Sequence, residues 1–267
     1  MEYDEERLSQ ADNQEYNQDD QYEEEAQEPV EPLVPCPPNR PMEIHHIVDT
    51  VNRYNHNLIP NLVEYVQDQL VNDHFDRDAN LALLKLYQFN PDRADAPVVS
   101  AILQLALGAL PDVDFSLCLA LLSKPMLTDR AVQALCACHA ALESAHYKSF
   151  WQQWNAKSGP KGSDFVTSEM SAADSESVYE ALDARIRRFI SGSISLTFQS
   201  LAAAHVEEYL ALSGADLAQW AETMGWTIAD VNGEKTVQIP ESAHPAPVIV
   251  REQLAITNLT KILSMTA

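Results

Sequence analysis

Apolar residues recur every three or four positions along most of the chain after residue 41, which is the spacing of amphipathic helices. The first two stripes, separated by a polar joint at 52–57, consist of Ile44, Ile47, Val48, Val51, Leu58, Ile59, Leu62, Val63, Val66 and Leu70. The pattern predicts further helices at 78–88, 97–109, 113–123, 128–144 and 146–154. The segment 97–109 is apolar nearly all round, so we expect neighbouring helices to enclose it.

The linkers between these segments are short and contain residues that typically begin or end helices. Asn90-Pro91 ends the helix at 78–88, Pro97 suits the first turn of the next helix, and Thr128 is a candidate N-cap. Links of about 3 to 8 residues make consecutive helices pack antiparallel. We therefore expect a stack of helix pairs like a short HEAT-type solenoid, although the sequence shows no fixed-period repeat.

The helical pattern is interrupted at 155–177, where Gly, Pro, Ser and scattered charges predict a flexible surface loop. Ser177 with Glu180 then fits a capping box that opens another helix. A helix is expected at 199–211, and Ser213 with Asp216 fits a second capping box for a helix at 214–224.

Two β-rich runs follow, and Asn232-Gly233 lies between them. Both residues tolerate a positive φ, so this dipeptide is a strong signal for a β-hairpin. Three helices followed by a hairpin is the order of a winged helix. A final amphipathic helix is predicted at about 247–264.

The charge distribution separates the N-terminal region from the rest. The formal net charge is −23; residues 1–31 hold 13 acidic residues against Arg7, which leaves −11 for the other 236 residues. Six prolines crowd residues 29–41. Such a segment cannot bury enough apolar surface to offset its ordering entropy, so 1–41 is predicted to be a disordered acidic tail. The tail either docks on a partner or only improves solubility.

Motifs for catalysis or cofactor binding are missing from the sequence: it has no phosphate loop, dinucleotide fingerprint, nucleophile elbow or H-E-x-x-H. Cys136 and Cys138 point about 200° apart on a helix and cannot hold one metal ion together. His45, His46 and His56 read as surface or capping residues, and Glu207-Glu208 as a solvated helix face. We therefore expect no enzyme activity, no cofactor and no metal.

No signal peptide or apolar stretch of about 18 residues is evident, so a protein of the cytosol or nucleus with reduced cysteines is expected. The third helix of the expected winged helix carries two acids and no Lys or Arg, and its wing carries only Lys235. Contact with phosphates is disfavoured, which favours contact with proteins instead. The candidate interaction residues are Trp220, Trp226, Val237, Ile239, Leu254 and Leu259. The alternative for the two tryptophans is a place in the core.

The run from Asp78 to Pro91 resembles the signature stretch of the subunit k family of eukaryotic translation initiation factor three. Its matching residues are Asp78, Asn80, Leu81, Lys85, Leu86, Tyr87, Gln88, Phe89, Asn90 and Pro91. Shorter matches occur in the same order at Arg53-Tyr54-Asn55, 114–118, Phe150-Trp151, 187–190, 197–199, Trp220 and Gly225-Trp226. The acidic tail and the 155–177 segment depart from the family pattern.

The resemblance implies a mostly α fold: a helical-repeat domain at 42–177, a winged-helix domain at 178–246 and a C-terminal helix at 247–267. It further implies a non-catalytic subunit of a large cytoplasmic complex that binds the small ribosomal subunit, with subunit l as its direct partner. A scaffold subunit of a proteasome-lid or signalosome-like complex, and a nucleic-acid-binding winged-helix protein, are the alternatives.

Overall fold

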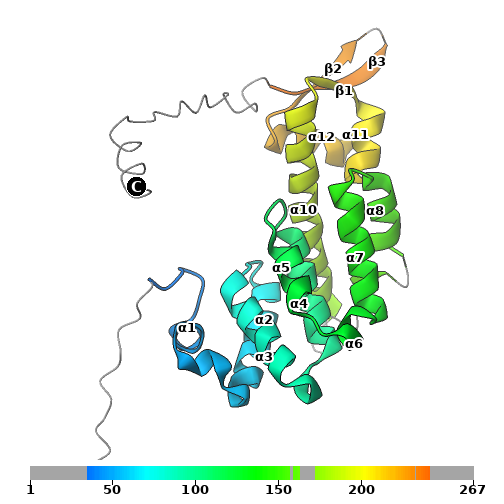
Figure 1. The fold of residues 1–267 in the computed structure, drawn as a ribbon. Helices are drawn as coiled ribbons and strands as arrows, with labels where there is room; N and C mark the ends of the chain where they lie inside the picture. The colour runs from blue at the N-terminus through cyan, green and yellow to red at the C-terminus, as the bar shows by residue number, and fades with distance from the viewer. Residues whose placement is uncertain (1–34, 157–158, 163–171, 232, 241–267) are drawn as a thin grey trace, which may run out of the picture. The chain divides into compact units, whose positions relative to one another are not determined.

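The computed structural model describes residues 35–156, 159–162, 172–231 and 233–240 (Figure 1). The chain divides into two units, Met1–Pro35 and Cys36–Ala267, and all the elements below belong to the second. Its α-helices are α1 (Met42–Asp49), α2 (Ile59–Val71), α3 (Arg77–Phe89), α4 (Ala96–Gly108), α5 (Asp114–Leu121), α6 (Lys124–Leu127), α7 (Arg130–Glu143), α8 (Tyr147–Trp154), α10 (Ala172–Thr197), α11 (Ala203–Leu210) and α12 (Ala215–Thr223). The strands are β1 (Ser200–Ala202), β2 (Thr227–Val231) and β3 (Glu234–Gln238), and short 3-10 helices lie at Val51–Tyr54, His56–Leu58, Pro91–Arg93 and Pro160–Gly162.

Local sequence signals explain both ends of α3. The Asp76 carboxylate accepts a hydrogen bond from the Ala79 backbone N–H at 3.2 Å, as an N-cap does. At the other end, Asn90 Nδ2 donates to the Leu86 carbonyl at 2.9 Å, and Pro91 follows. The predicted helix at 78–88 and its end at Asn90-Pro91 are confirmed. Pro97 likewise lies in the first turn of α4.

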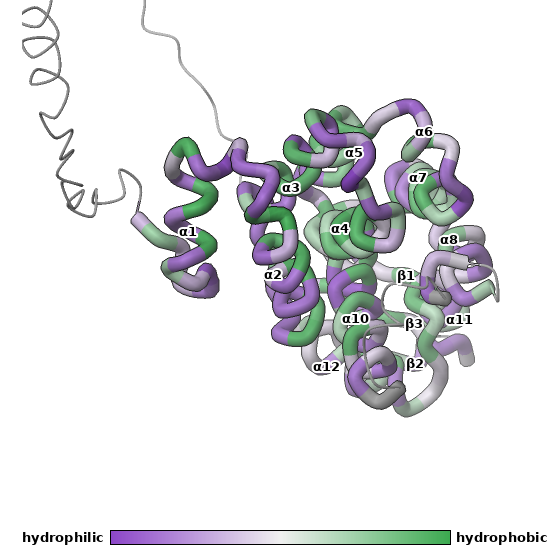
Figure 2. The backbone as a smooth tube through the Cα atoms, turned by 90° about the horizontal axis from the view of Figure 1, so that it is seen from below, coloured by the Kyte–Doolittle hydropathy of each residue, from purple (hydrophilic) through white to green (hydrophobic). Residues whose placement is uncertain are grey.

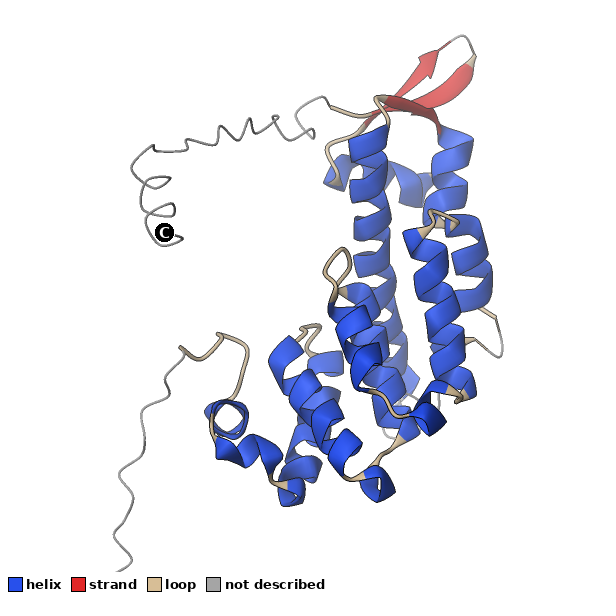
Figure 3. Ribbon diagram, in the orientation of Figure 1, coloured by secondary structure: helices blue, strands red, loops and turns tan. Residues whose placement is uncertain are grey.

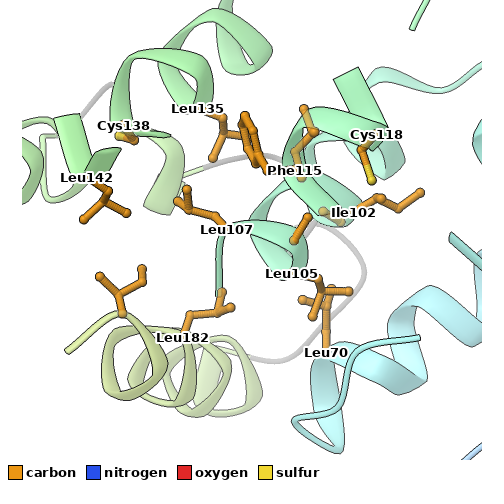
Figure 4. Packing of buried hydrophobic residues seen from close by; sticks show 14 of the residues in the cluster. Leu70, Ile102, Leu105, Leu107, Phe115, Cys118, Leu135, Cys138, Leu142 and Leu182 are labelled. Atoms are coloured by element: carbon orange, nitrogen blue, oxygen red, sulfur yellow. The ribbon is translucent and has the colours of Figure 1, made fainter. Parts of the chain in front are cut away.

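Helix α4 occupies the centre of the core. Every residue from Val98 to Leu107 is buried, and α2, α5, α7 and α10 all pack against this helix. Figure 4 shows Ile102, Leu105 and Leu107 pointing toward three different neighbours. In Figure 2 the α4 tube is strongly hydrophobic and is surrounded by the other helices. The prediction that neighbours enclose this segment is confirmed.

The second half of the compact unit has the element order of a winged helix. Helix α10 leads through β1 into α11, α12 and the β2–β3 hairpin (Figure 3). The three strands form an antiparallel sheet in the order β1-β3-β2. At the hairpin turn, Gly233 has a φ of +87° and its N–H donates to Asp230 Oδ1 at 2.9 Å. The predicted hairpin is confirmed.

Three predicted helix starts are wrong by one to several residues. Asp129, not Thr128, caps α7: its carboxylate accepts from the backbone N–H groups of Ala131 and Val132. Helix α10 already begins at Ala172, so Ser177 lies inside a helix and opens no capping box. The N-cap of α12 is Gly214, and no side chain caps this helix. At α7 the reason is local, because Thr128 Oγ1 donates to the Pro125 carbonyl of the preceding turn at 2.7 Å and leaves the cap to Asp129.

Three further differences concern the borders between elements. Residues 200–202, expected within a helix, form β1 because they pair with β3. Helix α10 runs without a break through residue 178, where the sequence places a domain border. Residues 36–41, placed in the tail by composition, belong to the compact unit. The predicted C-terminal helix and most of the predicted tail lie outside the described residues.

Candidate protein-interaction surfaces

Two tryptophans fasten the winged-helix part to α10. Trp220 Nε1 donates to Ser191 Oγ at 2.9 Å, and Trp226 Nε1 donates to Ser195 Oγ at 3.1 Å. The two serines are four residues apart and therefore share one face of α10. Trp226 is only 4% exposed, whereas Trp220 is half-buried. Of these two candidate interaction residues, only Trp220 presents surface to a partner.

The other candidates on the hairpin are buried as well. Val237 is fully buried and Ile239 is 8% exposed. Val237 lies on β3, the central strand, where it is paired with Leu201 of β1 on one side and Ile228 of β2 on the other. Val237 therefore offers no free strand edge, because β3 is paired on both sides. The outer strands are β1 and β2, and Ile228 on β2 is 40% exposed. Leu254 and Leu259 lie outside the described residues.

The electrostatics of the winged-helix part disfavour a nucleic-acid ligand. Residues 198–240 contain six acidic side chains and one basic side chain, Lys235. On α12, the helix that would enter a major groove in a DNA-binding winged helix, Asp216 and Glu222 are exposed. Phosphate contacts need several Lys or Arg residues, so this face suits a protein partner.

The winged-helix part is also joined to α8 of the helical-repeat part. Trp151 Nε1 donates to the Tyr209 carbonyl at 2.8 Å, and Arg187 Nε donates to the Leu210 carbonyl at 3.0 Å. The Arg187 guanidinium lies over the Trp151 ring, 5.1 Å from its centroid. These bonds satisfy carbonyls at the end of α11 that would otherwise lack partners. The helical repeats and the winged helix therefore form one frame.

The signature residues of α3 divide into a buried and an exposed face. Asn80, Leu86 and Tyr87 are buried, and Asn80 exchanges two hydrogen bonds of 2.9 Å with Gln69 of α2. The remaining signature residues are exposed or half-buried: Asp78, Leu81, Lys85, Gln88, Phe89, Asn90 and Pro91. The buried members hold α3 against α2. The exposed members are free to meet a partner.

A buried ion pair that sequence reasoning missed lies at the start of α3. Arg40 contacts Asp76 through two bonds of 2.5 Å, and Tyr65 Oη donates to Asp76 at 3.1 Å. Burial alone would raise the pKa of Asp76, but the hydrogen bonds from Arg40 and the backbone lower it below its ordinary value. Burial and the Asp76 charge raise the pKa of Tyr65. The only sequence feature that pointed to this pair was Arg40 itself, a single arginine within the proline-rich segment 29–41.

The cysteines and histidines that the structure describes do not gather into one cluster. Burial raises the pKa of the Cys118 and Cys138 thiols to about 12. His45, expected at the surface, is buried 3.4 Å from Arg40, while His46 and His56 are exposed. No group of three metal-ligating side chains occurs among the residues that the structure describes. Among the described helices, none combines the length and apolar character needed to cross a bilayer.

Comparison with known proteins points to one family. The model of the CSN8/PSMD8/EIF3K family matches residues 93–247. A protein of Botryotinia fuckeliana named eukaryotic translation initiation factor 3 subunit K is 30% identical over 250 residues, covering 85% of this chain and 94% of the relative. Proteins of the same name from Nematostella vectensis and Homo sapiens are each 29% identical, over 83% and 80% of this chain and 95% and 91% of their own lengths.

Proposed function

The chain belongs to the CSN8/PSMD8/EIF3K family, and we propose that it acts as a structural subunit of eukaryotic translation initiation factor 3. One observation carries this proposal. Relatives named subunit K of that factor match the chain across 91–95% of their own lengths, so the likeness extends over the whole subunit. Their alignments also cover at least 80% of this chain, so they include both the helical repeats and the winged helix.

The proposed mechanism is the presentation of surfaces rather than bond chemistry. The hydrogen bonds from Trp151 and Arg187 to α11, and from Trp220 and Trp226 to α10, keep the winged helix fixed on the helical repeats. A fixed frame presents its contact residues with little loss of conformational entropy on binding. In this proposal the chain works in the cytoplasm, binds subunit l directly and reaches the small ribosomal subunit through the complex.

Within the frame, we propose the outer strand β2 and the exposed part of Trp220 as contacts for a sister subunit. An outer strand has unpaired backbone groups that a partner strand can meet. Leu254 and Leu259 extend this proposal on the strength of the sequence pattern alone. Trp226, Val237 and Ile239 act indirectly, because their burial supports the sheet from which β2 is presented.

Affinity purification of the tagged protein from its own cells, followed by mass spectrometry, tests the complex to which it belongs. Recovery of the other initiation-factor subunits together with small-ribosomal proteins is the expected result. Recovery of proteasome-lid or signalosome subunits in their place would overturn the function while leaving the fold intact.

Mixing with recombinant subunit l tests the direct partner and the strand edge together. The wild-type chain should form a stoichiometric complex at micromolar concentration, and Ile228→Lys should weaken it because a charged side chain on an outer strand disfavours pairing. Gln133→Lys adds the same charge at an exposed position of α7, away from the proposed contact, and serves as the control. Equal effects of both substitutions would mean that the added charge weakens binding wherever it is placed, and that β2 is not the contact.

A further inference from the structure

An exposed pair of aromatic rings lies far from the winged helix. Tyr54, in the 3-10 helix after α1, and Phe89, the last residue of α3, have ring centroids 6.4 Å apart. Tyr54 is 59% exposed and Phe89 is 58% exposed. Val51, in the same 3-10 helix as Tyr54, is 85% exposed. The rings contact each other and still present most of their apolar surface to water.

Basic side chains surround this pair. Lys85 Nζ lies 4.9 Å from the Phe89 ring centroid, and the Arg53 guanidinium lies 5.8 Å from that of Tyr54. Arg93, just beyond α3, donates to the His56 carbonyl at 3.3 Å. This bond places a third positive charge next to the turn that follows Tyr54. We call Arg53, Tyr54, Lys85, Phe89 and Arg93 the aromatic–basic patch.

Among the described residues, no acidic side chain pairs with the charges of the patch. Within the described residues, none of its three basic side chains forms an ion pair; Lys85 instead donates to the amide oxygen of Gln88 at 2.7 Å. Other basic residues are engaged, for example Arg40 with Asp76 and Lys161 with Asp183. Asp92, an exposed neighbour of Arg93 in sequence, is the nearest acid along the chain. On a chain of net charge −23, three such cations around two exposed rings form an unusual local surface.

Packing among the residues that the structure describes does not explain this arrangement. Phe89 is exposed at the end of α3, whereas Leu83, Leu86 and Tyr87 earlier in the helix are buried. A cation over an exposed ring stabilises a fold only slightly, because water already solvates both groups. The same groups gain much more when a partner removes them from water and supplies an opposite charge.

We propose that the aromatic–basic patch is a docking site for an acidic segment of a partner protein that carries an aromatic or large aliphatic anchor. The anchor packs on the Tyr54 and Phe89 rings, and the flanking carboxylates pair with Arg53, Lys85 and Arg93. Charge complementarity selects this ligand, since the chain carries a net charge of −23 and therefore disfavours an acidic peptide elsewhere. The proposal goes beyond membership in the initiation factor and does not depend on it.

A nucleic-acid ligand fits the patch less well. Single-stranded nucleic acid needs a basic groove that follows several phosphates, together with rings on which successive bases stack. The patch offers three cations, and its two rings are tilted by 48° against each other, so they do not form one platform. A short acidic segment needs only one anchor and a few charges.

Fluorescence anisotropy of the full-length chain with a labelled probe peptide tests the proposal. The probe is about twelve residues of Asp and Glu around one central Phe, and its control carries Asn and Gln in place of the acids. The acidic probe should bind at least about tenfold more tightly than its control. Its affinity should fall as salt rises, because screening weakens exposed charge pairs.

Matched variants locate the binding. Phe89→Ser and Lys85→Glu should each weaken the acidic probe about tenfold, whereas Phe198→Ser and Lys235→Glu, the same changes at exposed positions of the winged-helix part, should not. Equal binding of the acidic and neutral probes, or equal loss in patch and control variants, overturns the proposal. Stronger, patch-dependent binding of single-stranded RNA would overturn it in favour of a nucleic-acid site.

Discussion

Arg40 and Asp76 lie 36 positions apart in the sequence and form a buried two-point ion pair, with both N···O distances at 2.5 Å. Arg40 is the residue that fixes the segment before α1 to the start of α3. The same Asp76 carboxylate caps α3 through Ala79 and accepts a bond from Tyr65. One carboxylate thus connects the chain before α1, helix α2 and helix α3.

Arg40→Met should lower the free energy of unfolding by about 3 kcal/mol, because it leaves the Asp76 charge buried without its cation. Urea denaturation followed by circular dichroism measures the change. Arg130→Met, at an exposed position, is the matched control and should change stability by less than about 0.5 kcal/mol. A loss below about 1 kcal/mol at Arg40 would show that the pair is not a main support of α3.

Stability should fall in acid partly through Asp76. Its pKa is lower in the folded chain than its ordinary value of 3.8, so the unfolded chain binds the proton first. The contribution is therefore complete above pH 3.8 and is lost as pH falls through the folded-state pKa. Asp76→Asn should cost stability at pH 7 and progressively less in acid. A difference between the two proteins that is constant with pH would contradict this assignment.

The Trp226–Ser195 hydrogen bond should contribute about 1 kcal/mol. A double-mutant cycle with Trp226→Phe and Ser195→Ala isolates it, since the indole donates to the serine hydroxyl at 3.1 Å and both residues are buried. The parallel cycle with Trp220→Phe and Ser191→Ala tests the half-buried bond, for which we expect a smaller coupling. Zero coupling in both cycles would mean that these two hydrogen bonds do not stabilise the attachment of the winged helix to α10.

Val237→Ala should destabilise the fold by about 2 kcal/mol without changing the affinity of the folded chain for a partner, because Val237 is fully buried on the central strand. Thermal unfolding measures the first effect, and titration with subunit l at low temperature measures the second. A loss of affinity in a variant that is still fully folded would contradict this prediction and would indicate that Val237 contributes to binding.

Alkylation should separate the cysteines by burial. Burial raises the pKa of Cys118 and Cys138 to about 12, so iodoacetamide at pH 8 should leave both unmodified in the folded chain and label both in urea. Cys36 and Cys136, which are partly exposed, should react first. Mass spectrometry of the digested protein gives the order, and early labelling of Cys138 would indicate local opening of α7.

The helices could be predicted where local signals agree with one another. Helix α3 has a polar N-terminal turn, apolar residues at helical spacing and Asn90-Pro91 at its end, and these act within a few residues of each other. The hairpin was similarly local, because Asn232-Gly233 sets the turn without reference to the rest of the chain. Enclosure of α4 followed from its lack of a polar face.

The missed features other than the helix starts depend on partners distant in sequence. Residues 200–202 become a strand only because β3 pairs with them, from about 35 residues further along. Trp220 and Trp226 could not be assigned to core or interface until α10 was seen to offer Ser191 and Ser195 beneath them. The aromatic–basic patch likewise combines Arg53 and Tyr54 with Lys85 and Phe89 from another helix.

By itself, the sequence determined the all-helical repeats, the winged-helix order and the family resemblance, because helix periodicity, turn residues and motif runs are encoded in neighbouring positions. Only the tertiary structure decided that Val237 lies on a central strand, that Arg40 is buried against Asp76, and which aromatic side chains stay in water. Burial and strand position are properties of the assembled chain: they depend on which distant segments pack together, and no local pattern specifies that.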